Sequence, residues 1–274
     1  MLHHNKTIIM GASILFLLTC CAVLAPYIAP SPPDEMDYQA RMQLPSRNHP
    51  FGTDFFGRDI LARTVYGSRI ALLVGTLSVS LAVIPGVGLG LLAGYKRGWL
   101  DVVIMHTMDS LLSFPTLLLA ITIITVLGPG HIQVTISIAI IFVPAFTRLV
   151  RGQTLIVREE EYVQAAHALG ASDFGIICRH ILPNILGPVI VQITVSFANA
   201  ILIEAGLSFL GLGTQPPLPS WGMMLQEARS FMTQQPWAAI MPGIAIALSV
   251  LGFNLTGDGL RDWLDPRFRP RMMR

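Results

Sequence analysis

Six long apolar runs constrain this chain more than any other feature of its sequence. Each holds about 20 residues, the length that a helix needs to cross the hydrocarbon core of a bilayer. Because lipid offers the backbone no hydrogen-bonding partner, a crossing segment is helical unless it belongs to a closed barrel. The short alternating segments typical of a barrel do not occur. We therefore predict an all-α membrane protein with six transmembrane helices, over residues 8–29, 70–94, 102–127, 132–150, 186–203 and 237–255.

Composition excludes several other classes of protein. Of the 274 residues, 53% are apolar and 12% are charged, whereas a typical soluble domain is about 25% charged. So few charges do not cover the surface of a soluble fold. A soluble enzyme, a disordered chain and a disulfide scaffold are therefore excluded. The net charge of +2 comes from scattered basic residues, so we expect no nucleic-acid partner.

The distribution of Lys and Arg predicts the orientation, because these residues concentrate in cytoplasmic segments. If the N-terminus is cytoplasmic, 12 of the 18 basic residues fall inside the cell. We therefore predict a multi-pass membrane protein with both termini in the cytoplasm. The alternative is that the first run is a cleaved signal peptide ending before Cys20. Thr19 fits that pattern poorly, and the run is long enough to span.

The sequence shows no pattern typical of catalysis or metal binding. Cys20, Cys21 and Cys178 have no metal-ligand spacing, and we expect reduced thiols. The Gly206–Ser208 stretch lacks the spacing of a serine nucleophile. No phosphate-binding loop occurs, since the stretch ending at Lys96 lacks the required spacing. We predict no catalytic residue, metal site or cofactor in this chain. If the chain works with ATP, the ATP and Mg²⁺ would bind to another polypeptide.

Glycine and proline mark special places within the spans. Gly86, Gly90 and Gly94 follow one another at four-residue spacing, so they share one helix face that another helix can approach closely. We interpret this face as a packing seam, with ordinary glycine enrichment as the alternative. Four prolines interrupt spans and predict kinks: Pro85, Pro115, Pro144 and Pro242.

Several polar residues lie within or near spans, where they are costly unless they face protein or water. Asp109 lies three residues after His106 and either lines a path or sits at the membrane surface. Gln192 and Asn199 are candidates for a polar lining, with helix–helix hydrogen bonding as the alternative. Thr194 and Ser196 belong to the same set, and Glu204 raises the same question.

The segment 151–187 predicts two short helices on the cytoplasmic side. Residues 159–169 form the first helix, on which Tyr162, Ala165, Ala166 and Leu169 share a face. Gly170 ends this helix, Ser172 caps a second one over residues 173–182, and Pro183 stops it. Such a rigid knob can transmit motion from a soluble partner into the spans, although a structured loop without a partner is equally consistent. On the outer side, the apolar segment 205–213 is too short to cross, so we expect it to bend back into the outer mouth.

These stretches resemble known permeases. Gln164-Ala165-Ala166, then Gly170 and Leu182-Pro183, resemble the "EAA" loop of ABC-importer permeases, although Gln164 replaces the usual Glu and His180 the usual Ile. Three further stretches, at residues 49–63, 204–224 and 254–267, are similar to signatures of the peptide/nickel group. The whole chain resembles the C-type permease subunit of dipeptide/oligopeptide/nickel ABC importers.

The resemblance implies a type I ABC-importer permease fold. It divides the chain into an N-terminal region 1–68, a permease domain 69–258 with the coupling loop 151–187, and a basic cytoplasmic tail 259–274. The implied partners are a second homologous permease, two ATPase subunits, an extracytoplasmic solute-binding protein and membrane lipid. The residues assigned to ATPase coupling are Glu161, Gln164, Ala165, Ala166, Gly170, Leu182 and Pro183. Those assigned to the outer gate or substrate path are Glu204, Gly206, Ser208, Gly211, Gly213 and Trp221, with Asp109, Gln192 and Asn199 lining the pore.

Di- or oligopeptide is the substrate that the resemblance favours, with nickel or a metal chelate as the alternative. A stand-alone ion-coupled transporter is a different class of hypothesis, but it predicts internal repeats that the sequence does not show. A membrane enzyme would need a cluster of catalytic residues, and none is found in the sequence.

Overall fold

The computed structural model describes residues 2–264, and in this part of the chain the regular structure is helical, without strands. The long helices are joined by shorter ones and by a π-helical turn, Ile177–Ile181, between α8 and α9. The helices are α1 (Leu2–Val23), α2 (Ala25–Ile28), α3 (Ile60–Lys96), α4 (Gly98–Leu112), α5 (Thr116–Leu127), α6 (His131–Arg158), α7 (Glu161–Ala168), α8 (Asp173–Ile176), α9 (Leu182–Phe209), α10 (Trp221–Ala228) and α11 (Trp237–Leu264). The all-α fold class is confirmed.

Among the described residues, five helices are long and apolar enough to cross a membrane, and a bent pair brings the number to six. The five are α1, α3, α6, α9 with the turns that lead into it, and α11. The bent pair is α4 with α5, which meet at an angle of 92°. The predicted third span, 102–127, is therefore wrong as a single straight helix. The break falls at Pro115, which lacks an N–H and disfavours helical geometry at Phe114.

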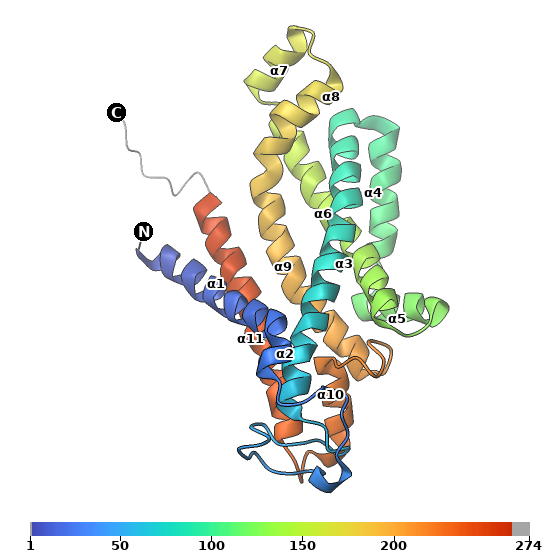
Figure 1. Cartoon of the computed structure of the whole chain (residues 1–274). Coiled ribbons are helices and arrows are strands. Elements are labelled where there is room, and N and C mark those ends of the chain that lie inside the picture. Colours follow the sequence, from blue (N-terminus) through green and yellow to red (C-terminus); the bar gives the residue numbers. More distant parts are fainter. Residues whose placement is uncertain (1, 265–274) are drawn as a thin grey trace.

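The long helices form two groups (Figure 1). Helices α3 and α6 lie side by side, α9 packs against both, and α4 flanks them. Helices α1 and α11 form a second pair that diverges from the others toward the two termini. Helices α7 and α8 project beyond the spans at one end, here called the loop end. The opposite end, here called the α10 end, carries α10 and the segment 29–59.

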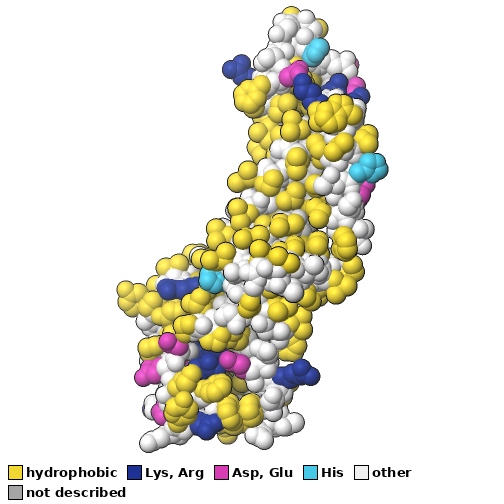
Figure 2. All heavy atoms as spheres, turned by 90° about the vertical axis from the view of Figure 1, so that its right-hand side faces the viewer, with side chains coloured by type: hydrophobic (Ala, Val, Ile, Leu, Met, Phe, Trp, Pro, Cys, Tyr) yellow, Lys and Arg dark blue, Asp and Glu magenta, His cyan; other side chains and the backbone are white. Residues whose placement is uncertain are grey.

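The surface agrees with a protein that crosses a membrane. Figure 2 shows hydrophobic side chains over the middle of one face, with charged side chains gathered toward the two ends. Apolar side chains are stable against lipid, whereas charged side chains are stable in water and among headgroups. The membrane therefore surrounds the middle of the molecule.

The glycine seam predicted for the second span is confirmed. A Cβ atom at Gly86 would lie 2.6 Å from Phe146 Cβ, and one at Gly90 would lie 2.7 Å from the carbonyl oxygen of Thr147. At Gly94 the nearest atom would be Thr154 Cβ, at 2.7 Å. All three neighbours belong to α6, so the absence of side chains lets α3 and α6 approach at backbone distance.

Pro85, Pro144 and Pro242 lie inside α3, α6 and α11, which continue through them, so the kinks expected there stay predictions. One further boundary differs from the sequence-based expectation. Helix α9 runs to Phe209, so the short apolar segment predicted to bend back begins as part of the span. The chain turns only at Leu210 and Gly211, where Gly211 adopts a φ of +81° that suits glycine. A buried glutamate, described below, ties this turn to α9.

Candidate functional site

The loop between α6 and α9 folds as two short helices around a glycine turn. Helix α7 ends before Gly170, which has a φ of +82°, a value that glycine adopts without strain. Ser172 then caps α8, because its Oγ accepts a hydrogen bond from the Gly175 N–H at 3.2 Å. Both predictions for this turn are confirmed.

The expected stop at Pro183 is wrong. The chain remains helical from α8 through the π-helical turn into α9, with Pro183 in the first turn of α9. In the wider turn the Leu182 N–H bonds to the Ile177 carbonyl. Proline is tolerated at a helix start because the N–H that it lacks needs no partner there. The loop is therefore joined rigidly to α9 instead of being hinged at Pro183.

An apolar core fixes one face of the loop to the spans. Val163 of α7 and Ile176 of α8 are buried, and they pack in one cluster with Val150 of α6 and Ile185 of α9. Tyr95 at the end of α3 belongs to the same cluster. The loop thus contacts the ends of three spans, α3, α6 and α9.

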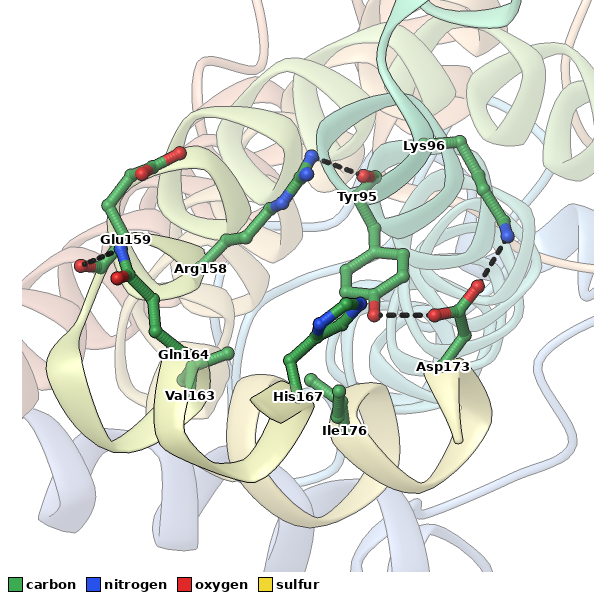
Figure 3. Close-up of a pocket in the computed structure, with 9 residues that line it drawn as sticks. All are labelled: Tyr95, Lys96, Arg158, Glu159, Val163, Gln164, His167, Asp173 and Ile176. Atoms are coloured by element: carbon green, nitrogen blue, oxygen red, sulfur yellow. Dashed lines mark hydrogen bonds and ion pairs between the residues drawn. The ribbon is translucent and has the colours of Figure 1, made fainter. Parts of the chain in front are cut away.

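Charged and polar groups add to this attachment (Figure 3). The Asp173 carboxylate accepts from the Tyr95 hydroxyl at 2.9 Å and from Lys96 Nζ at 2.6 Å. Hydrogen bonding to Lys96, then to Tyr95, holds the pKa of the Asp173 carboxyl below its usual value. Arg158 Nη1 donates to the Tyr95 carbonyl oxygen at 2.6 Å, and Arg97 pairs with Glu159.

A cavity of about 480 Å³ lies between the loop and the ends of α3 and α6. Gln164 is the one predicted coupling residue that lines it, and its Nε2 donates to the Glu159 carbonyl oxygen at 3.2 Å. A glutamate at this position could not donate that hydrogen bond when ionised. The departure from the usual loop sequence is thus accommodated by a hydrogen bond.

The opposite face of the loop is exposed and partly apolar. Leu169 is 89% exposed and Phe174 is 77% exposed, although both are large apolar side chains. Tyr162 is also exposed, and the neighbouring Glu161, Ala165 and Gly170 are exposed with it. Although Tyr162 is exposed, partial desolvation of its hydroxyl, with the Glu160 charge nearby, raises the pKa of that hydroxyl. Of the other predicted coupling residues, Ala166 and Leu182 are half-buried and Pro183 is exposed.

The candidate pore-lining residues fall in different surroundings. Asn199 of α9 and Gly206, two turns beyond it, line a cavity of about 420 Å³, together with Thr116 of α5 and Phe142 of α6. Gln192 does not line this cavity, and its Nε2 donates to Ser196 Oγ at 3.3 Å within α9. The cavity lining carries no charged side chain.

The residues assigned to the outer gate divide into interior and surface groups. Glu204 is 1% exposed, and its Oε1 accepts from Ser208 Oγ at 2.7 Å and Thr214 Oγ1 at 3.3 Å. Gly213 packs against Ser208. Trp221 is also buried, and its Nε1 donates to the Thr64 carbonyl oxygen at 2.8 Å.

Gly206 and Gly211 are not buried, so they form the surface group. Their assignment to a gate, like that of the interior group, stays a prediction.

The motif after the first span builds a buried charge cluster at the α10 end. Asp54 Oδ2 lies 2.7 Å from Arg58 Nε and 2.5 Å from Arg63 Nη1. Both arginines also reach Glu227 Oε2, at 2.7 and 2.6 Å. Asp59 caps α3 by accepting from the Ala62 N–H at 2.7 Å. Asp54 and Arg58 thus pair within the motif, and Glu227 joins them from α10, in a distant part of the chain.

The sequence model described as "binding-protein-dependent transport system inner membrane component" matches residues 86–270, two thirds of the chain. The chain belongs to this family. A second model, the N-terminal TM domain of oligopeptide transport permease C, matches residues 1–50 of the permease.

Similar transport proteins align with nearly the whole length of the permease. The dipeptide transport system permease protein DppC of Alkalihalophilus pseudofirmus is 48% identical over 98% of this chain and 88% of its own length. The glutathione transport system permease protein GsiD of Pectobacterium atrosepticum is 44% identical over 98% and 89%. The di/tripeptide transport system permease protein DppC of Pseudomonas aeruginosa is 43% identical over 97% and 90%.

Two ion pairs that the sequence reasoning missed join α4 of the permease to α6. Asp109 Oδ1 lies 2.6 Å from Arg148 Nη2, so the partner of Asp109 is an arginine instead of His106. Asp101 receives two hydrogen bonds from Arg151, at 2.5 and 2.7 Å. The sequence contains two acids eight residues apart on one helix and two arginines three residues apart on another. Which acid pairs with which arginine could not be predicted without the packing of the helices.

The structure describes only part of the C-terminal tail predicted for the permease. Helix α11 reaches Leu264, and the rest of the predicted basic tail 259–274 lies outside the described residues. The boundaries 1–68, 69–258 and 151–187 stay predictions. Within residues 2–264 no group of three or more His, Cys, Asp or Glu is placed to hold a metal ion.

Proposed function

We propose that this permease is one of two homologous transmembrane subunits of an ATP-driven importer that moves di- and oligopeptides across the cytoplasmic membrane. The relatives named for dipeptide, di/tripeptide and glutathione transport support this substrate class, because their substrates share peptide bonds. Two ATPase subunits bind at the loop end, and they hold the ATP and Mg²⁺. A solute-binding protein delivers the peptide at the α10 end.

The two faces of the loop are the observation that carries this proposal. The inner face is anchored to α3, α6 and α9 by buried apolar contacts, whereas the outer face leaves Leu169 and Phe174 exposed among residues 2–264. Large exposed apolar side chains on a rigid element are typical of a docking surface. Closure of the ATPases would push the loop, and the anchored face would pass that displacement to the three spans.

The cavity at Asn199 is the candidate for the peptide path. Asn199 is exposed on a membrane-spanning helix, and its amide has no hydrogen-bond partner among residues 2–264. A polar group in a span is costly unless it faces water or protein. An amide that both donates and accepts, in a lining without charge, suits the peptide backbone and not a particular side chain.

Co-purification of ATPase subunits tests the docking surface. Leu169→Asp places a charge on the exposed face without disturbing the buried one, and we expect ATPase recovery to fall by at least about tenfold. The matched control is Leu44→Asp, since Leu44 is similarly exposed but lies at the α10 end. We expect the second permease subunit to be recovered with both variants.

Wild-type recovery of ATPases with Leu169→Asp would exclude the outer face as the docking surface. A wild-type chain that is isolated alone, folded and monodisperse would contradict the subunit assignment itself. Uptake of labelled dipeptide and of Ni²⁺ by the same cells distinguishes the two substrate classes.

A further inference from the structure

An apolar cavity between α1, α3 and α11 has no role in the transport cycle proposed above. Its volume is about 260 Å³, and Trp221, the first residue of α10, is one of the residues that line it. The lining is mostly aliphatic and comes from all three helices, including Leu17 of α1, Val65 of α3 and Leu248 of α11. These helices meet in this part of the molecule, where the two helix groups converge (Figure 1).

The polar groups that line the cavity are already satisfied. Thr64 Oγ1 donates to the Ile60 carbonyl at 2.7 Å, and Ser249 Oγ donates to the Ala245 carbonyl at 2.7 Å. Ser68 Oγ donates to the Val65 carbonyl, and the Trp221 indole donates to the Thr64 carbonyl. A cavity without free donors or acceptors holds water poorly. Its surface therefore suits a hydrocarbon chain.

The cavity is bordered by side chains that face the surroundings of the spans. Leu17 is 63% exposed, and Ile244 and Leu248 of α11 are exposed beside it. Both helices are candidate membrane spans, so the molecules that reach this border from outside are lipids. The acyl chain of a lipid gains free energy from each methylene that it buries in such a site.

A positively charged side chain lies next to the cavity, where it could pair with the headgroup of a lipid. Arg69 follows Ser68, which lines the cavity, and its guanidinium donates to the carbonyls of Ala22 and Val23 beside Cys21, another lining residue. No carboxylate among residues 2–264 pairs with Arg69. The guanidinium also lies 5.1 Å from the centre of the Tyr66 ring. Arg69 is exposed and Tyr66 is half-buried, and tyrosine is enriched at the level of lipid headgroups.

We propose that this cavity binds one acyl chain of a membrane phospholipid whose phosphate group pairs with Arg69. The guanidinium retains donors for the phosphate after its two bonds to α1, because it has five N–H groups. The bound lipid fills the space between α1 and α11 on one side and α3 on the other.

Photo-crosslinking in vesicles tests the acyl-chain site. The complete transport complex is reconstituted in equal amounts of phosphatidylethanolamine and phosphatidylglycerol, with a trace of phosphatidylglycerol that carries a diazirine in one acyl chain. We expect crosslinks on lining residues of α1 and α11. Ala245→Phe fills the cavity, whereas Ala247→Phe makes the same change on an exposed residue two positions along α11. We expect at least about a fivefold loss of lining crosslinks with Ala245→Phe and none with Ala247→Phe.

Leu248→Trp is a second filling variant, because Leu248 lies at the border of the cavity, where extra volume is tolerated. Equal crosslinking in the filled variants and in Ala247→Phe would overturn the proposal. So would crosslinks spread evenly over the outward faces of α1 and α11. Absence of crosslinks on the lining residues of the wild-type complex would also overturn it, as expected if a second protein subunit occupies the cavity.

Arg69→Gln tests the headgroup. We expect crosslinking by the phosphatidylglycerol probe to fall about fivefold, the effect of one arginine on an anionic lipid. A diacylglycerol probe with the same diazirine chain lacks the phosphate, so its crosslinking should not change. An equal loss for both probes would mean that Arg69 only holds α1 in place, and this result would overturn the pairing with phosphate.

Discussion

Asp54 has four hydrogen bonds, more than any other carboxylate in the charge cluster at the α10 end. It accepts from the backbone N–H groups of Phe56 and Arg58, at 2.8 and 3.0 Å, as well as from the Arg58 and Arg63 side chains. Because Asp54 is buried, removing its charge leaves two buried arginines with only Glu227 to neutralise them. Breaking a buried ion pair from one side is strongly destabilising.

The first prediction follows from this cluster. Asp54→Asn keeps the size of the side chain but removes the charge, and we expect the free energy of unfolding to fall by about 3 kcal/mol. Thermal unfolding of the purified permease in detergent measures the loss. Glu35→Gln, an exposed acid in the same segment, should leave the melting temperature unchanged. A shift of equal size in both variants would contradict the role given to burial.

Single residues also show which ion pairs could be predicted from the sequence. The pairing of Asp54 with Arg58 is local, because these residues are four positions apart in the chain. Glu227 lies 169 positions after Arg58, and no local pattern connects them. The same holds for Asp109, whose partner Arg148 is 39 positions away. Buried or long-range ion pairs depend on the packing of helices, which residue spacing alone does not encode.

At the scale of elements, the close-packing face of α3 was predictable, because its glycines recur about once per helical turn. Glycines at four-residue spacing fall on one face, and their approach to α6 follows from geometry. Proline was less informative. Pro115 breaks a helix, whereas Pro85 lies within a helix that continues and Pro183 within the first turn of one. The effect of a proline depends on which carbonyl loses its partner and whether a wider turn relieves the clash.

The second prediction concerns this seam. Gly90→Ala puts a methyl group 2.7 Å from the Thr147 carbonyl oxygen and from Val150 Cβ, so α3 and α6 have to separate at a cost of about 1–3 kcal/mol. Gly88→Ala is the matched control, since its methyl group meets nothing within 4 Å. Alanine there should stabilise the helix by about 0.5–1 kcal/mol. Melting temperatures that move in opposite directions are the expected result, and equal shifts would contradict the seam.

The third prediction concerns α4. Met108 is the only residue of α4 that is buried. The ion pairs of Asp101 and Asp109 therefore contribute much of the attachment of α4 to α6. Partly exposed pairs contribute about 0.2–1 kcal/mol each. Replacing both Arg148 and Arg151 by Ala should therefore make α4 amides exchange hydrogen about fivefold faster in lipid nanodiscs. Arg229→Ala, at the α10 end, should leave α4 unchanged. Exchange at the wild-type rate in the double variant would mean that apolar contacts suffice.

At the scale of the whole molecule, the two ends are built for different tasks. The loop end combines a rigid, anchored hairpin with an exposed apolar face. The α10 end is closed by the buried charge cluster and by the turn that Glu204 ties to α9. The cavity at Asn199 lies between them, on helices that also reach the loop through α6 and α9. A push on the loop therefore reaches the lining of the cavity through continuous helices.

The fourth prediction concerns which side of the membrane each end faces. Cys178 is exposed in the turn between α8 and α9, whereas Cys20 and Cys21 are half-buried in α1. In a background with both α1 cysteines changed to Ala, a membrane-impermeant maleimide should label Cys178 only after the cells are permeabilised. Leu44→Cys, at the α10 end and in a chain with Cys178→Ser, should be labelled in intact spheroplasts.

This outcome would place the arginines around the loop, Arg148, Arg151, Arg158 and Arg179, in the cytoplasm, as the distribution of basic residues predicts. Labelling of Cys178 in intact spheroplasts would instead place the loop outside the cell. ATP is cytoplasmic, so the loop could not then dock an ATPase, whatever its shape. The orientation of the chain therefore decides whether the exposed face of Leu169 and Phe174 can work as the coupling surface.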